Sequence, residues 1–121
     1  MLWNKRGRDV IFGFAGQDLL AWALAAFFVI GAVGNWIAPP NVRAEYTRWG
    51  YPDWFHYVTA GLELLVAMFL AFASTRFWGV GLGAAIILAA IATLLLHKEY
   101  RHALLPTTVL LFLILQGYLS F

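Results

Sequence analysis

Three polar side chains fall on one face of an otherwise apolar segment in the middle of the chain. His56, Thr59 and Glu63 stand at positions i, i+3 and i+7, a spacing that puts all three on one side of a helix. An imidazole, a hydroxyl and a carboxyl in a row can donate, accept and exchange protons with the polar part of a ligand. The spacing therefore predicts a polar stripe that runs inward from one end of this helix.

Glu63 is the most informative of these residues because of its depth. With a helix that starts near Trp54, Glu63 lies about 13 Å along the axis at 1.5 Å per residue, close to the middle of a bilayer. No lysine or arginine lies within the predicted spans to neutralise it. A lone charge at this depth costs a few kcal/mol or more, so Glu63 either carries a proton or is held by hydrogen bonds or water. Acidic residues inside a membrane are functional hypotheses by default, and a structural bond to a threonine is the alternative.

A second half-site is predicted at the end of the next apolar segment. Thr93 and His97 stand at i and i+4, again on one helix face. A four-helix topology brings this helix end to the membrane side on which the helix of His56 begins. We therefore expect a pocket lined by His56, Thr59, Glu63 and His97, with Glu63 at its floor.

Simpler interpretations exist for the residues around Glu63. Either histidine can place its polar tip in the headgroup region at a helix end, and a threonine in a helix often bonds to its own backbone. No metal site is expected, because His56 and Glu63 are separated by about 10 Å along the helix axis. A haem between His56 and His97 is not expected either, since both lie toward helix ends.

The composition identifies lipid as the main solvent of the chain. Of 121 residues, 63% are hydrophobic and 12% are charged, about half the charged share of a soluble domain. A soluble domain of this size could not bury that much apolar surface. Four apolar stretches are each close to the roughly 20 residues that cross about 30 Å of hydrocarbon. The sequence predicts an all-α, integral membrane four-helix bundle that forms a single domain over residues 1–121, with helices at about 18–37, 54–73, 77–96 and 103–121.

The orientation in the membrane is weakly encoded. Four helices place both ends of the chain on one side and the 38–53 loop on the other, and lysines and arginines divide four against four. The first helix usually dominates, and Lys5, Arg6 and Arg8 directly precede it. This favours cytoplasmic ends and a non-cytoplasmic 38–53 loop. A cleaved signal peptide is the competing interpretation, but the first apolar run is longer than a signal region and ends in two prolines.

Several classes of function are excluded by residue types alone. The chain has no cysteine, which removes disulfides, thiolate nucleophiles, cysteine-ligated zinc and thiol redox chemistry. The formal charge of +2 is small and scattered, so no nucleic-acid partner is expected. Gly79 and Gly83 form a GxxxG pattern that allows close helix approach. We expect it to pack within the bundle, with a homo-oligomer as the alternative.

One segment resembles a known family. The run from Trp54 to Leu65, WFHYVTAGLELL, resembles the second-helix signature of the DoxX-like family of small four-helix bacterial membrane proteins. His97, the charged link after it and Pro106 are also similar. The family takes its name from a subunit of a thiosulfate:quinone oxidoreductase. The resemblance therefore implies a quinone-linked protein of the bacterial cytoplasmic membrane, or a membrane partner of a soluble oxidoreductase.

Two functions of different classes remain open on the sequence. The first is a quinone- or lipophile-binding subunit of a membrane redox system, in which Glu63 hydrogen-bonds the ligand and a partner holds the electron carrier. The second is a non-catalytic accessory subunit that packs against a larger membrane complex through glycine- and alanine-rich helix faces. A small transporter or proton pathway is less favoured, because no internal repeat is visible between the two halves of the chain.

Overall fold

The computed structural model describes residues 15–121, which form helices and short connections and no strand. Helices α2 (Ala15–Ile37), α5 (Arg76–Leu96) and α6 (Leu104–Ser120) each lie in a segment long and apolar enough to cross a membrane. Helix α4 (Phe55–Ala71) is apolar and has 17 residues, the shortest length that spans a bilayer core. The predicted all-α fold is therefore confirmed, with three clear candidate spans and a shorter fourth helix.

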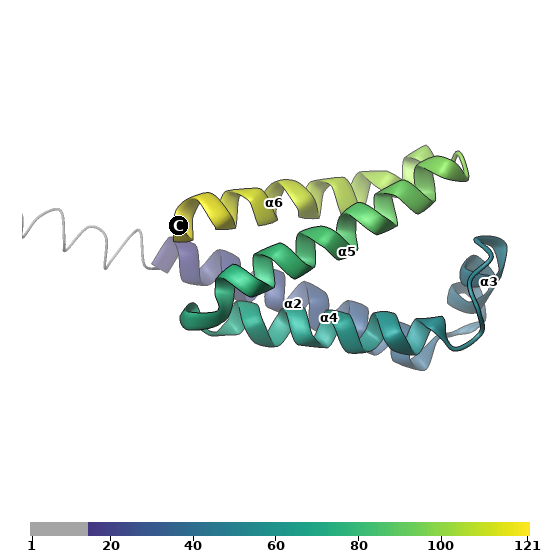
Figure 1. Cartoon of the computed structure of the whole chain (residues 1–121), viewed down its shortest axis with the longest axis horizontal. Helices are drawn as coiled ribbons and strands as arrows, with labels where there is room; N and C mark the ends of the chain where they lie inside the picture. The colour runs from purple at the N-terminus through teal and green to yellow at the C-terminus, as the bar shows by residue number, and fades with distance from the viewer. Residues whose placement is uncertain (1–14) are drawn as a thin grey trace, which may run out of the picture.

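The long helices pack side by side as a bundle (Figure 1). Helix α2 packs along α4, α4 packs against α5, and α5 packs against α6, to which it is joined through η3 (Tyr100–Ala103). The start of α2 and the end of α6 lie at the same end of the bundle. Lys5, Arg6 and Arg8, on which the predicted orientation depends, lie outside the described residues.

The bundle is apolar both inside and outside. Its core includes Phe28, Val66, Leu70 and Leu113, which are fully buried. Many large apolar side chains point outward instead, with Ile30 72% exposed. Such a surface suits lipid, in which every backbone group must be satisfied within its own helix.

The 38–53 segment differs from the predicted loop, because it contains helix α3 (Pro40–Arg48). Pro39 has no N–H to continue α2, and Pro40 occupies the first turn of the next helix, where a missing N–H does no harm. Ala38 joins the two helices with φ of 46°. The pair of prolines thus ends one helix and begins another, and α3 lies across the end of the bundle opposite the C-terminus (Figure 1).

The end that carries the C-terminus is closed by a buried ion pair. Asp18 of α2 and Arg76 of α5 are 4% and 2% exposed and bond to each other. The Arg76 Nε also donates to the carbonyl oxygen of Leu70 at 2.9 Å, near the end of α4. Asp18 therefore connects α2 to α5.

Two glycines of α5 allow its close approach to α4. A Cβ on Gly79 would lie 2.9 Å from the backbone nitrogen of Leu70, and one on Gly83 would lie 3.2 Å from a methyl of Val66. Both glycines are buried. The structure therefore places the GxxxG pattern inside the bundle.

Candidate ligand-binding crevice

Two adjoining pockets lie under α3, between α5 and the pair formed by α2 and α4. One, of about 190 Å³, is lined mainly by α4 and α5. The other, of about 370 Å³, is lined by α2, α4 and α5. Together they form one crevice, and the residues common to both are Tyr46, Trp49, Thr59, Ile86 and Ala90.

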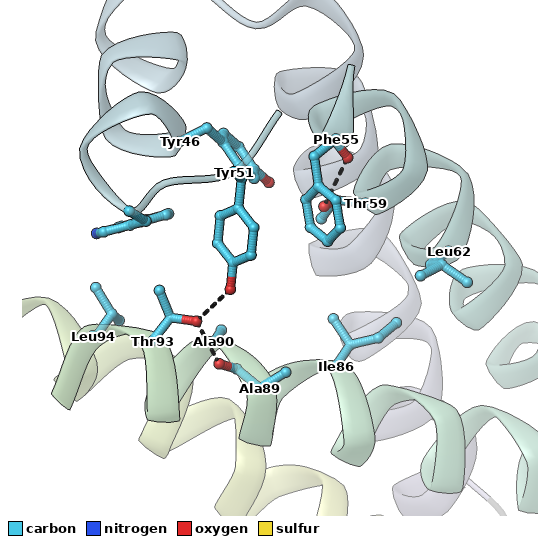
Figure 2. Close-up of a pocket in the computed structure, with 11 residues that line it drawn as sticks. Tyr46, Tyr51, Phe55, Thr59, Leu62, Ile86, Ala89, Ala90, Thr93 and Leu94 are labelled. Carbon is cyan, nitrogen blue, oxygen red and sulfur yellow. Dashed lines mark hydrogen bonds between the residues drawn. The ribbon is translucent and has the colours of Figure 1, made fainter. Parts of the chain in front are cut away.

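Aromatic side chains form the wall of the crevice that faces α5. The rings of Tyr51 and Phe55 stack at 4.6 Å between centroids and are nearly parallel, with 9° between their planes. Figure 2 shows these two rings on one side and the α5 residues Ala89 and Thr93 on the other. The Tyr51 hydroxyl reaches across to Thr93 Oγ1 at 2.7 Å. A flat apolar group would find an aromatic surface on one side and small side chains on the other.

The floor of the crevice is the carboxyl group of Glu63, which is 8% exposed. Its Oε1 accepts a hydrogen bond of 2.6 Å from Asn35 Nδ2. The same nitrogen donates to the Gly31 carbonyl at 3.0 Å. Because a carbonyl can only accept, this contact fixes which end of the Asn35 amide is nitrogen. Tyr46 then donates its hydroxyl hydrogen to Asn35 Oδ1 at 2.7 Å.

Gly31 allows the carboxyl group to lie against α2. A Cβ at this position would collide with Glu63 Oε2. Within residues 15–121 Oε2 has no hydrogen-bond partner, while Oε1 is held by Asn35. One oxygen of Glu63 is thus fixed by the protein, and the other is left to whatever enters the crevice.

His56 supports the site from behind. Its Nδ1 donates to the carbonyl oxygen of Asn35 at 2.8 Å. That carbonyl would otherwise bond to the N–H four residues later, but this residue is Pro39, which has none. The ring is buried and lines a separate, polar pocket of about 250 Å³ together with Arg43 and Asp53. His56 is therefore linked to Glu63 through Asn35 and does not line the crevice.

Thr59 and His97 are placed differently from each other. Thr59 lines both parts of the crevice, and its hydroxyl donates to the Phe55 carbonyl at 3.3 Å. His97 is exposed and turns back on its own helix, where Nδ1 donates to the Thr93 carbonyl at 2.8 Å. The expected convergence of His97 on Glu63 is thus not found, because its ring bonds to the Thr93 carbonyl, which also accepts the backbone N–H of His97 at 3.2 Å.

The outer edge of the crevice is held by Glu99, in the link after α5. Its carboxylate accepts bonds of 2.6 Å from the Trp49 indole and 2.6 Å from Arg48, and it also contacts His102 at 3.2 Å. The Trp49 hydrogen bond, followed by those of Arg48 and His102, lowers the pKa of Glu99. On α3, burial raises the pKa of the Tyr46 hydroxyl. The segment after α3 is thus tied to the end of α5 by polar contacts over an apolar space.

Sequence reasoning missed the residues that cover the crevice. Tyr46, Trp49 and Tyr51 all come from the stretch predicted to be a loop. The density of aromatic residues in this stretch was a signal, but it is equally typical of an interfacial belt. Asn35 was noticeable only as a polar residue at a depth similar to that of Glu63. Among the residues described, no three histidine, aspartate or glutamate side chains gather where they could hold a metal ion.

Fold and site together define a small all-helical membrane protein with a polar-floored crevice at one end of its bundle. The family model described as DoxX-like family matches residues 19–116. The chain therefore belongs to the DoxX-like family, and the interpretation drawn from residues 54–65 is confirmed. No curated protein and no solved structure matches the chain.

Proposed function

We propose that this protein binds a lipophilic ligand of the quinone class in the crevice, as a membrane subunit of a redox system. The observation that carries the proposal is the combination of aromatic walls with one free carboxyl oxygen at the floor. Ligand sites of this kind are largely apolar and contain a few polar groups that orient the ligand. The oriented group here is the head of the lipophile.

The ligand enters with its ring between the Tyr51–Phe55 stack and the small residues of α5. Burial of its apolar surface contributes about 25 cal/mol per Å². The ring oxygens then reach Glu63 and Thr59, the polar groups nearest the bilayer interior. An isoprenoid or alkyl tail stays in the surrounding lipid.

Electrons come from a partner under this proposal. The chain has no cysteine, and His56 and His97 point to different parts of the fold. The partner is a soluble oxidoreductase or a larger membrane complex that carries the redox cofactor. We assign the protein to the bacterial cytoplasmic membrane with the crevice on the non-cytoplasmic side, as first-helix charge dominance favours.

Native mass spectrometry of the protein extracted from its own membranes in mild detergent tests this function. Wild-type protein should retain a quinone-class molecule, and Glu63→Leu should lose it. Leu64→Ala, at an exposed position of the same helix, is the matched control and should retain the ligand. Equal ligand occupancy in wild type and Glu63→Leu, or no small molecule in any sample, would contradict the proposal.

An accessory role in a larger membrane complex is the second candidate, and one surface favours it. Gly81 and Ala85 are exposed four residues apart on α5, and small residues at this spacing admit a neighbouring helix closely. Gly81→Leu should then release a larger complex from the purified protein and leave ligand occupancy unchanged. Intact co-purification of the complex with Gly81→Leu would argue against this surface.

A further inference from the structure

We infer that the crevice selects a ligand whose polar head donates hydrogen bonds, which is the hydroquinone form in preference to the quinone. This inference rests on the proposed function, because it requires a lipophile in the crevice. It extends that function by naming the redox form that fits.

On the α2 and α3 side, the polar side chains donate their hydrogens to acceptors within the protein. Both hydrogens of the Asn35 amide go to Gly31 and Glu63. The only hydroxyl hydrogen of Tyr46 goes to Asn35 Oδ1, which can only accept. The lone pairs of the Tyr46 oxygen are therefore what this side chain can still offer to a ligand.

On the α4 and α5 side, the hydroxyl groups also donate their hydrogens to acceptors within the protein. Thr93 donates to the Ala89 carbonyl at 2.9 Å, so the Tyr51–Thr93 contact has Tyr51 as its donor. Figure 2 shows the bonds from Tyr51 to Thr93 and from Thr93 to the Ala89 carbonyl, together with the bond from Thr59 to the Phe55 carbonyl. The tyrosine and both threonines have each given their hydrogen to a protein oxygen.

The indole N–H of Trp49, another donor in the lining, is also engaged, because it donates to Glu99. Oxygen lone pairs therefore remain on Tyr46, Tyr51, Thr59 and Thr93, and the lining side chains offer no free donor apart from the carboxyl groups of Glu63 and Glu45 when they carry a proton. An ionised Glu63 adds a further acceptor at Oε2. A hydroxyl head is matched by this lining, whereas a carbonyl head would be buried with its acceptor unpaired, which is disfavoured.

The test compares three ligands on the full-length protein in nanodiscs. Isothermal titration calorimetry under argon would measure the affinity of a decyl-substituted benzoquinol, the corresponding quinone and the dimethyl ether of the quinol. We expect the quinol to bind at least about tenfold more tightly than either other compound. Equal affinity for quinol and dimethyl ether, or tighter quinone binding, overturns the inference and leaves the proposed function standing. No binding of any of the three overturns both.

A threonine pair sharpens the test. Thr93→Val removes the acceptor of the Tyr51 hydrogen, which becomes free to donate to a ligand carbonyl. The preference for quinol over quinone should then fall by about threefold or more. Thr108→Val is the matched control, because Thr108 makes the same bond to its own helix on an exposed face of α6. An unchanged preference in Thr93→Val, with helical content equal to wild type, would contradict the assigned donor directions.

Discussion

The two ends of the bundle hold their buried carboxyl groups in different ways. At the C-terminal end, the Asp18 carboxylate is paired with the Arg76 guanidinium, which also bonds to a backbone carbonyl. At the α3 end, the Glu63 carboxyl has one amide donor and one oxygen that no described residue contacts through a hydrogen bond. Asp18 thus has a cation as its partner, whereas Glu63 has only a neutral amide and borders a crevice that a ligand could enter.

The packing of α5 also differs between the two ends of the bundle. Near Arg76, Gly79 brings α5 against the backbone of α4. Farther along α5, Ile86 and Ala90 line the crevice, which lies under α3. Close packing at one end thus anchors the helices that line the pockets at the other.

Breaking the buried ion pair should have the largest effect on stability. Arg76→Met leaves Asp18 without its partner and should lower the free energy of unfolding by about 3–5 kcal/mol. Unfolding by denaturing detergent, followed by circular dichroism, measures the loss. The double variant Asp18→Leu with Arg76→Met removes both charges and should recover most of it. If the double variant is as unstable as the single one, the ion pair is not the reason.

Enlarging Gly79, where α5 approaches α4 closely, should have the next largest effect on stability. Gly79→Ala places a Cβ within 2.9 Å of the Leu70 backbone, and the strain should cost about 1–3 kcal/mol in the same unfolding measurement. Gly81→Ala, which has open space around its Cβ, is the control and should leave stability unchanged or slightly higher. Equal behaviour of the two variants would refute close packing at Gly79.

Moving the Glu63 carboxyl should affect the crevice end specifically. Gly31→Ala displaces Oε2 and should weaken quinol binding about tenfold, while the unfolding free energy changes by about 1 kcal/mol or less. Gly16→Ala adds a methyl on the same helix, at the end away from the crevice and into open space, and should leave the affinity near that of wild type. Calorimetry on both variants decides the point, and an unchanged affinity in Gly31→Ala would show that the Glu63 position does not control binding.

Glu99 should give the smallest effect, visible as a pH dependence. Because the Trp49 and Arg48 bonds hold the Glu99 pKa below its usual value of 4.5, folding favours the ionised form. This contribution to stability is complete above the unfolded pKa and is lost as pH falls through the lowered value. Thermal unfolding between neutral and acid pH should show a shallower acid-side decline in Glu99→Gln than in wild type. Identical profiles would contradict the role of these bonds.

The sequence was sufficient to predict those parts of the site that depend on one helix. Hydropathy alone predicts the long helices, and a carboxylate in lipid draws attention to Glu63 wherever its partners lie. Contacts between helices were harder to infer. Nothing local to Asp18 or Arg76 indicates that they meet, since each is also a plausible residue for a helix end. His97 was placed wrongly because a histidine that bonds to its own helix has the same spacing as one that faces a pocket.

The covering helix α3 was missed for a different reason. Two consecutive prolines indicate the end of a helix as strongly as they indicate the start of one. The aromatic residues that follow are equally typical of an interfacial belt, and only the path of α3 turns Tyr46 toward Asn35. The structural interpretation therefore adds the partners of Glu63, whereas the sequence had provided the residue itself.

The most direct test of the account is to locate the ligand. A benzoquinol with a diazirine close to its ring would be photolysed with the protein in nanodiscs, and the labelled residues would be mapped by mass spectrometry. We expect labels on Leu62, Ile86 or Ala90 that excess unlabelled quinol removes and that Glu63→Leu lacks. Labels spread over the outward faces of α2 and α6, without competition by unlabelled quinol, would contradict a binding site in the crevice.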